Sequence, residues 1–205
     1  MPVDPIVLLA FIPAALALNL TPGADMMFCF GQGLRHGPKA SIAASLGISV
    51  GFYFQTIIAG LGVGAIVTAY PVAFDLIRWV GVAYLLWLAW KSLHTEPVTA
   101  YKSNSNFAFR EGLIVNLTNP KVLLFIFAFI PQFIDPARGS VLLQFMVFSL
   151  VPFIGGFFIN AAVGIFASGI GRQMMGSARF SRILGYVSAS VFGLLAVRLA
   201  FWERT

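Results

Sequence analysis

Two long stretches of this chain carry no formal charge, one between Lys39 and Asp75 and the other between Arg138 and Arg172. A helix of about 20 apolar residues crosses the ~30 Å hydrocarbon core of a bilayer, so each stretch can supply a tilted or extended span. Over all 205 residues, 59% are hydrophobic and only 10% are charged, whereas soluble domains carry about 25% charged residues. The chain is therefore predicted to be an integral membrane protein.

Six apolar segments are long enough to cross a bilayer, which predicts an all-α polytopic fold with six transmembrane helices. The first segment follows Asp4, and no Lys or Arg precedes it. It lacks the positive region of a secretory signal peptide, so we interpret it as a retained transmembrane helix. The segments run from about 5–30, 40–69, 72–90, 112–133, 141–170 and 183–202.

The orientation of these spans is predicted from the Lys and Arg residues of alternate loops, which are enriched on the cytoplasmic side. The loops after the first, third and fifth spans hold eight, and the opposite side holds four. The eight are Arg35, Lys39, Lys91, Lys102, Arg110, Arg172, Arg179 and Arg182, and the four are Arg78, Arg138, Arg198 and Arg204. Both termini are therefore expected outside the cytoplasm.

The most polar part of the first span is the heptad from Asn19 to Asp25, "NLTPGAD". It places the helix-breaking pair Pro22-Gly23 and a carboxylate inside an otherwise apolar run, where both are costly. Such a break is tolerated at membrane depth where it is buried in protein or lines a cavity. Two interpretations of Asp25 are open. It either binds a substrate ammonium group or a proton in a cavity, or caps the following helix at the membrane interface.

The fourth span forces a lysine into the membrane. Only thirteen residues separate Lys121 from Asp135, which is too few to cross, so the span begins upstream and includes Lys121. A lysine at the centre of a span costs about 2.5 to 3.5 kcal/mol and usually faces a cavity or a partner. Lys121 either lines a cavity, where it binds a carboxylate or pairs with Asp25, or extends its side chain to the cytoplasmic surface.

Three motifs recur in the same order in the two halves of the chain. "NLTPGAD" matches "NLTNPK" (116–121), "GFYFQ" (51–55) matches "GFFIN" (156–160), and Arg78-x-x-Gly81 matches Arg182-x-x-Gly185. We predict two three-helix units, 1–92 and 112–205, joined by a polar cytoplasmic linker at 93–111. Because each unit crosses the membrane three times, the two copies have inverted topology. Many secondary transporters have this architecture, and their broken helices form the binding site at the repeat interface.

We predict that the two breaks together bind a small polar substrate and a coupling proton. Thr21 and Thr118 are expected to hydrogen-bond carbonyls that the prolines release. Gln55 and Asn160 either line the cavity or bridge helices, and bridging is favoured. The candidate site residues are Asn19, Pro22, Gly23, Asp25, Asn116, Asn119, Pro120 and Lys121.

Other classes of protein fit the sequence less well. The net charge is +6, but the thirteen Lys and Arg form no basic stripe, so no nucleic-acid partner is expected. His36 and His94 lie in predicted loops, and neither a metal site nor a cofactor is predicted. An enzyme is disfavoured because the motifs H-E-x-x-H and G-x-S-x-G are absent from the sequence. One Asp and one Lys within the predicted spans are also few residues for a catalytic site. A membrane-embedded enzyme, a channel or an assembly factor remains the alternative function.

The "TPGAD" element (21–25) of the first helix and the "NPK" element (119–121) of the fourth resemble the LysE/RhtB family of bacterial amino-acid exporters. The resemblance covers nearly the whole chain. It implies a homodimer in the bacterial inner membrane that exports amino acids or close derivatives, driven by the proton gradient or membrane potential. The family often has a second proline where this chain has Ala24, a difference that leaves the break in place. Because Asp25 is the one good deep anion, neutral or weakly polar substrates are favoured.

Overall fold

The computed structural model describes residues 2–69, 71–94, 107–168 and 178–200, and all regular elements in these ranges are helical. The predicted all-helical class is therefore confirmed. In chain order the elements are α1 (Pro5–Leu20), α2 (Ala24–His36), α3 (Pro38–Ala69), α4 (Pro71–Leu93), α5 (Ala108–Leu117), α6 (Pro120–Leu124), the π-helix η2 (Phe125–Phe129), the 3-10 helices η3 (Ile130–Phe133) and η4 (Pro136–Arg138), α7 (Val141–Ala167) and α9 (Ala178–Ala200).

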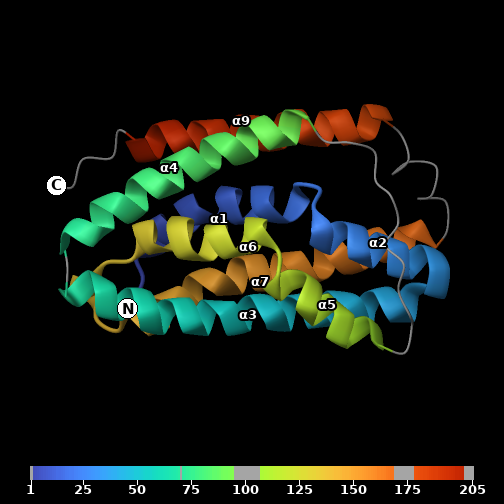
Figure 1. The fold of residues 1–205 in the computed structure, drawn as a ribbon, viewed down its shortest axis with the longest axis horizontal. Coiled ribbons are helices and arrows are strands. Elements are labelled where there is room, and N and C mark those ends of the chain that lie inside the picture. Colours follow the sequence, from blue (N-terminus) through green and yellow to red (C-terminus); the bar gives the residue numbers. More distant parts are fainter. Residues whose placement is uncertain (1, 70, 95–106, 169–177, 201–205) are drawn as a thin grey trace.

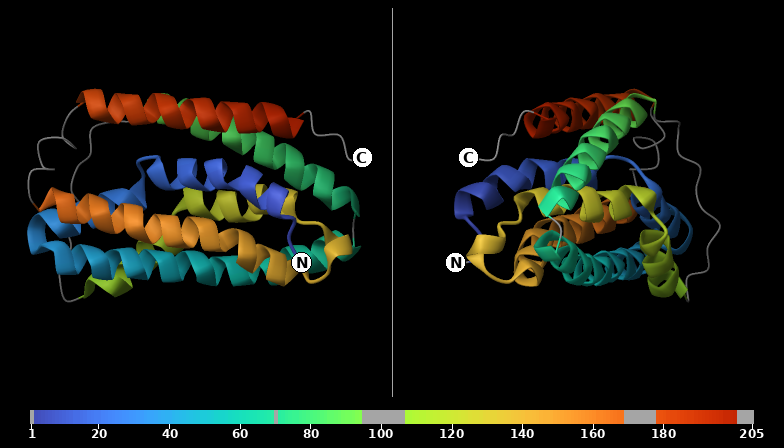
Figure 2. Two further views of the ribbon diagram at one scale, coloured as in Figure 1. Left: turned by 180° about the vertical axis from the view of Figure 1, so that it is seen from behind. Right: turned by 60° about the vertical axis from the view of Figure 1, so that its left-hand side comes forward.

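The helices run along one common direction and form layers (Figure 1 and Figure 2). Helices α4 and α9 pack side by side on one side of the molecule, and α3 packs against α7 on the other. Between these layers lie α1 and α6. The start of α1 and the end of α9 are at the same end of the bundle (Figure 1).

Helix α3 buries several polar side chains and exposes a stripe of large apolar ones. Buried positions include Ser41, Ser45, Ser49, Gln55 and Thr56. The exposed stripe, with spacings of three or four residues, consists of Ile42, Leu46, Val50, Phe54, Ile58 and Leu61. Such spacing keeps side chains on one face of a helix. A soluble protein would bury this stripe, so its exposure indicates that the surroundings of α3 are lipid.

Two described helices are long and apolar enough to cross a membrane unaided, namely Pro38–Gly62 within α3 and Val141–Ala167. Two more candidate spans are bent pairs: α1 with α2 at 50°, and α5 with the segment Pro120–Phe133 at 52°. The predicted third and sixth spans correspond to α4 and α9, whose described apolar stretches, Trp79–Leu93 and Gly185–Leu194, are shorter. By length and composition the described residues thus support up to four of the six predicted spans.

Aromatic packing fixes α1 against the second bent pair. The ring of Phe11 lies 5.1 Å from Phe133 and Phe148 and 5.9 Å from Phe125, measured between centroids. Phe11, Phe125 and Phe148 are fully buried. Tilted and edge-to-face aromatic pairs contribute about 0.5–1.5 kcal/mol beyond the area they bury. This cluster holds α1 close to η2, η3 and α7 and so sets the distance between the two breaks.

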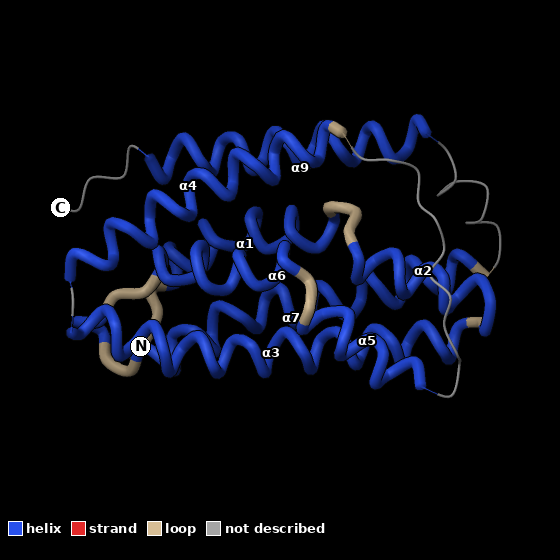
Figure 3. Tube along the Cα trace, in the orientation of Figure 1, coloured by secondary structure: helices blue, strands red, loops and turns tan. Residues whose placement is uncertain are grey.

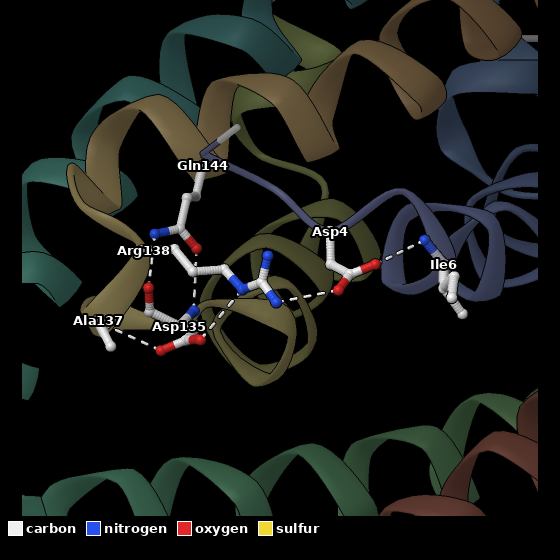
Figure 4. A network of polar contacts seen from close by, with 6 residues as sticks. All are labelled: Asp4, Ile6, Asp135, Ala137, Arg138 and Gln144. Carbon is white, nitrogen blue, oxygen red and sulfur yellow. Dashed lines mark hydrogen bonds and ion pairs between the residues drawn. The ribbon is translucent and has the colours of Figure 1, made fainter.

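A polar network ties the start of α1 to the turn before α7 (Figure 4). Asp4 caps α1 by accepting from the Ile6 amide at 2.8 Å, and Arg138 donates to Asp4 at 3.0 Å. Arg138 also lies 3.3 Å from the carboxylate of Asp135, and Gln144 hydrogen-bonds both the amide and the carbonyl of Asp135. Because these ion pairs are partly exposed, each contributes little stability. The network anchors one end of the bundle.

Small residues allow α3 and α5 to approach closely. A Cβ at Gly47 would overlap the carbonyl oxygen of Phe109 and lie 3.0 Å from the Leu113 amide. A Cβ at Gly112 would likewise overlap the backbone of Ala44. Such contacts between backbones are typical of membrane helices. Gly47 and Gly51, four residues apart on α3, thus form a close-packing motif against α5.

We predict that Gly47→Ala lowers the free energy of unfolding by about 1–3 kcal/mol, because its Cβ has no space against α5. Thermal unfolding of the purified protein in detergent measures the effect. The matched control is Gly62→Ala on the same helix, where a Cβ would meet nothing within 4 Å. The control should be neutral or stabilising, since alanine favours helices by about 1 kcal/mol over glycine. Equal losses in the two variants would contradict the packing account.

Candidate functional site

The first break interrupts the chain between α1 and α2, near the middle of the bundle (Figure 3). In an α-helix each amide donates to the carbonyl four residues earlier. Pro22 has no amide hydrogen, so the carbonyl of Leu18 loses its helical donor. Thr21 is the last residue to continue the pattern, with its amide 2.9 Å from the Ala17 carbonyl and its hydroxyl donating to the same oxygen. The Thr21 hydroxyl thus bonds within its own helix, but not to the Leu18 carbonyl that Pro22 releases, so the predicted repair of that carbonyl by Thr21 is wrong.

The second break lies between α5 and α6 and has the same construction (Figure 3). Pro120 deprives the Asn116 carbonyl of its helical donor. The Asn119 side chain caps α6 by accepting from the Lys121 amide at 3.0 Å. Thr118 donates its hydroxyl to the Ile114 carbonyl at 2.9 Å and not to the Asn116 carbonyl that Pro120 releases, so the predicted repair of that carbonyl by Thr118 is wrong. Both breaks therefore end one half-helix and start another inside the bundle.

Side chains from elsewhere in the chain replace the donors that the prolines lack. The Lys121 ammonium nitrogen, Nζ, lies 3.0 Å from the Leu18 carbonyl and 2.9 Å from the Thr21 carbonyl. The Gln55 amide nitrogen lies 3.1 Å from the Asn116 carbonyl, which also accepts from the Asn119 amide. An unsatisfied backbone group in hydrocarbon costs several kcal/mol. These contacts remove that cost at both breaks.

Asp25 is buried in the first turn of α2, with 8% of its surface exposed. Its two carboxylate oxygens each accept an amide hydrogen bond at 3.0 Å, one from Asn116 and one from Asn119. Gln55 in turn donates to the Asn116 side-chain oxygen at 3.0 Å, so a chain of amides links α3 to this carboxylate. The positive end of the α2 dipole favours the negative charge of Asp25. Asp25 is therefore buried inside the protein, where both of its carboxylate oxygens are hydrogen-bonded.

Lys121 and Asp25 do not form a direct ion pair, since no nitrogen–oxygen distance between them is within 4.0 Å. The suggestion that they pair with each other is therefore not realised in this structure. Lys121 instead neutralises the negative end of the α1 dipole, and Asp25 occupies the positive end of α2. Nor does Lys121 extend to the surface, because its ammonium group is bound at the first break. The two charges stabilise opposite sides of one break and remain separate.

The remaining predicted residues divide between bridging and lining roles. Asn19 donates to the Pro152 carbonyl of α7 at 3.2 Å. Gln55 bridges α3 and α5, as favoured from the sequence. Asn160 is buried and lines a small cavity beside Asp25. Gly23 leaves room for Lys121, because a Cβ there would lie 3.1 Å from the ammonium nitrogen.

The cavity beside Asp25 has a volume of about 30 Å³, which is room for about one water molecule. Its polar lining consists of Asn19, Asp25, Ser49, Asn116, Lys121 and Asn160. A wider cavity of about 140 Å³ lies on the other side of Lys121, against Thr21, Gly23, Leu88, Lys91, Ser92 and Asn119. The cavity beside Asp25 is thus too small for an amino acid, and a solute of that size requires a movement of the surrounding groups.

Two residues of the site were not predicted from the sequence. Ser49 lines the small cavity, and its buried hydroxyl has no hydrogen-bond partner. The repeat Ser41-x-x-x-Ser45-x-x-x-Ser49 in an apolar span is the signal that could have identified it, because four-residue spacing forms a polar stripe. Tyr84 donates to the Lys121 carbonyl at 2.6 Å and holds α4 against α6. A lone tyrosine among many aromatic residues carries no comparable signal.

Fold and site together define a helical membrane protein in which two broken helices enclose an interior polar site. The family model described as LysE type translocator matches residues 16–202. The chain therefore belongs to the LysE family of translocators, and the resemblance based on "TPGAD" and "NPK" is confirmed. Members of this family are transporters, so the protein is not an enzyme.

Three relatives illustrate the similarity. A homoserine/homoserine lactone efflux protein of Salmonella typhimurium is 27% identical over 93% of this chain and 94% of its own length. A leucine efflux protein of Enterobacter sp. is 30% identical over 72% of this chain and 78% of its own. An uncharacterized membrane protein of Vibrio cholerae is 36% identical over 63% of this chain and 66% of its own length. No solved structure matches the chain.

We predict that Asn116→Leu lowers the free energy of unfolding by about 1–3 kcal/mol, because it leaves one oxygen of Asp25 without its donor and removes a partner of Gln55. Thermal unfolding in detergent measures this loss. The matched control, Thr118→Val on the same helix, removes an exposed hydroxyl that bonds only to its own helix. The control should change stability by less than about 0.5 kcal/mol. A neutral Asn116→Leu would show that the amide network does not hold the site.

Proposed function

We propose that this protein exports amino acids or close derivatives from the bacterial cytoplasm. The observation that carries the proposal is one interior cavity lined by both a carboxylate, Asp25, and an ammonium group, Lys121, which are not paired with each other. An amino acid has both complementary charges. Buried charges in a membrane protein usually mark the path of a substrate or an ion. Two relatives whose names describe amino-acid efflux support the same class of substrate.

The proposed binding mode uses both half-helices. The substrate carboxylate meets Lys121 and backbone amides at the start of a half-helix, where the dipole favours anions. The substrate ammonium group meets Asp25 in its ionised form, as the carboxylate described above, after the carboxyl group has released its proton. When the site reopens on the outside, the substrate leaves and Asp25 takes up a proton again. This exchange is the proposed proton coupling, and it makes the protein an antiporter.

An inverted repeat would supply the alternating access that export needs. We propose units 1–92 and 112–205, with residues 93–111 as the linker. The bends of the first and fourth spans, 50° and 52°, are nearly equal. The Asn19 side chain packs on Gly156, and the Asn116 side chain packs on Gly51, with corresponding Cβ to Oδ1 distances of 3.2 and 3.1 Å. Asn19 matches Asn116 in the repeated motifs, and Gly51 matches Gly156. A two-fold axis between the repeats would therefore superimpose one Asn–Gly pair on the other.

The packing of the other helices supports the same symmetry. Helix α3 packs on α7, and α4 packs on α9. Under the proposed axis each of these helices contacts its own counterpart. We place both termini outside the cytoplasm, on the charge distribution of the loops, and retain the homodimer as an expectation from the family. The start of α1 and the end of α9 lie at one end of the bundle, as this topology requires (Figure 1).

Neutral or weakly polar amino acids are the favoured substrates. Asp25 is the one carboxylate among the residues that line the two cavities. Once it binds the α-ammonium group of a substrate, no second anion remains there for a cationic side chain. Homoserine and leucine, named for two relatives, have no charged side chain. A channel or an assembly factor is the alternative, and a channel would not move its solute against a gradient.

We predict that proteoliposomes containing the protein, loaded with the twenty amino acids and homoserine, lose one or a few neutral solutes when a pH gradient is imposed. Asp25→Asn should reduce this driven efflux by at least about tenfold, because the variant cannot exchange a proton. Mass spectrometry of the retained solutes measures the loss.

Asp135→Asn is the matched control, since Asp135 is an exposed carboxylate in the turn before α7. It should transport like the native protein. Proton-driven transport that persists in Asp25→Asn would contradict the proposed role of Asp25. No efflux beyond that of protein-free liposomes would contradict amino-acid export itself.

A further inference from the structure

The Lys121 ammonium group occupies a cation-binding position that the first break creates. The position is formed by two carbonyl oxygens, those of Leu18 and Thr21, at 3.0 and 2.9 Å from Nζ. Both belong to the end of α1, where the helix dipole is negative. The Leu18 carbonyl can accept a hydrogen bond from another group because Pro22 has no amide hydrogen to donate to it. Donor hydrogens and positive charge are therefore both required there, and a primary ammonium group has both.

Gly23 opens this position to an ammonium group from outside α1. A Cβ at residue 23 would lie 3.1 Å from Lys121 Nζ and 3.3 Å from Cε. Both distances are shorter than ordinary carbon contacts. The glycine is therefore explained by the space that the lysine needs, and not only by the bend of the chain.

Lys121 also stands between the two cavities. Its side chain lines the 30 Å³ cavity, which contains Asp25, and the 140 Å³ cavity, which borders Lys91 and Ser92 at the end of α4. While Nζ donates to the two carbonyls at the end of α1, the Lys121 side chain connects α6 to α1 between the two cavities. Release of Nζ removes that bridge.

We propose that the carbonyl pair of Leu18 and Thr21 is a binding site for primary ammonium groups, and that Lys121 occupies it in the empty protein. During loading, the amino group of the transported solute first displaces Lys121 from this pair and then passes on to Asp25, and the displaced lysine is free to meet the solute carboxylate. Displacement joins the two cavities, so loading the site and opening the passage are one event. The identity of the solute rests on the proposed export function, whereas the ammonium site does not.

Lys121→Ala tests the site directly, because it empties the carbonyl pair while leaving Pro22 and Gly23 in place. In detergent, 100 mM methylammonium chloride should raise the Tm of this variant by about 2–4 °C, as expected for a ligand whose dissociation constant is about fivefold below that concentration. The native protein should show no such rise, since its own lysine fills the site. Tetramethylammonium chloride, which has no N–H donor, and sodium chloride are the matched salts.

A second measurement covers the case in which Lys121→Ala does not fold. Gly23→Ala keeps the lysine but crowds Nζ, so amine-selective labelling followed by mass spectrometry should show faster modification of Lys121 than in the native protein. Lys91, which lines the same wider cavity, is the internal control and should be unchanged. Unchanged labelling of Lys121 would overturn the proposal.

Two results of the Tm measurement would overturn the proposed ammonium site. Equal stabilisation by sodium or tetramethylammonium would show that the position does not select an ammonium group. No stabilisation of a folded Lys121→Ala variant by methylammonium would show that no such site exists. Neither result depends on transport, so a failure of the export assay and a failure of this proposal are distinguishable.

Discussion

Two carbonyl groups that lose their helical donors inside a membrane are the constraint on which this structure depends. Pro22 and Pro120 create them, and hydrocarbon offers nothing to satisfy them. Each is satisfied by a side chain from a different part of the chain: Lys121 for Leu18, and Gln55 for Asn116. The breaks therefore hold distant segments together as well as interrupting their own helices.

The charges of the site follow from the same constraint. An ammonium group is stable at the end of α1 and a carboxylate at the start of α2, because the half-helix dipoles point that way. Asp25 then takes its amide donors from Asn116 and Asn119, at the second break. Each half of the chain thus supplies the partners of the other half. A movement of one half against the other would break these hydrogen bonds.

Much of this arrangement could be predicted from the sequence. Uncharged runs longer than a bilayer identify the class of protein, and a proline beside an ionisable residue in an apolar run identifies each break. Ser49 was also accessible through its four-residue spacing. The hydrogen-bond partners of Asp25 and Lys121 could not be predicted from the sequence. Several polar residues were candidates, and only the three-dimensional structure shows which of them make the contacts. Tyr84 and the cavity sizes depend on packing details that no sequence pattern records. The predicted spans at α4 and α9 likewise extend beyond the apolar stretches that are described.

The most direct test of this account is whether the cavity beside Asp25 is where the solute binds. Cys29 is the single cysteine and is buried, so Cys29→Ala provides a background for Ser49→Cys. Modification of this cysteine by a membrane-impermeant thiol reagent is then measured without solute and with each of the twenty amino acids and homoserine. Ile58→Cys on the lipid-facing side of α3 serves as the control. The account predicts that residue 49 reacts, that the transported amino acid slows its reaction, and that residue 58 does not respond. Reaction at residue 49 that none of the twenty amino acids nor homoserine changes would contradict it.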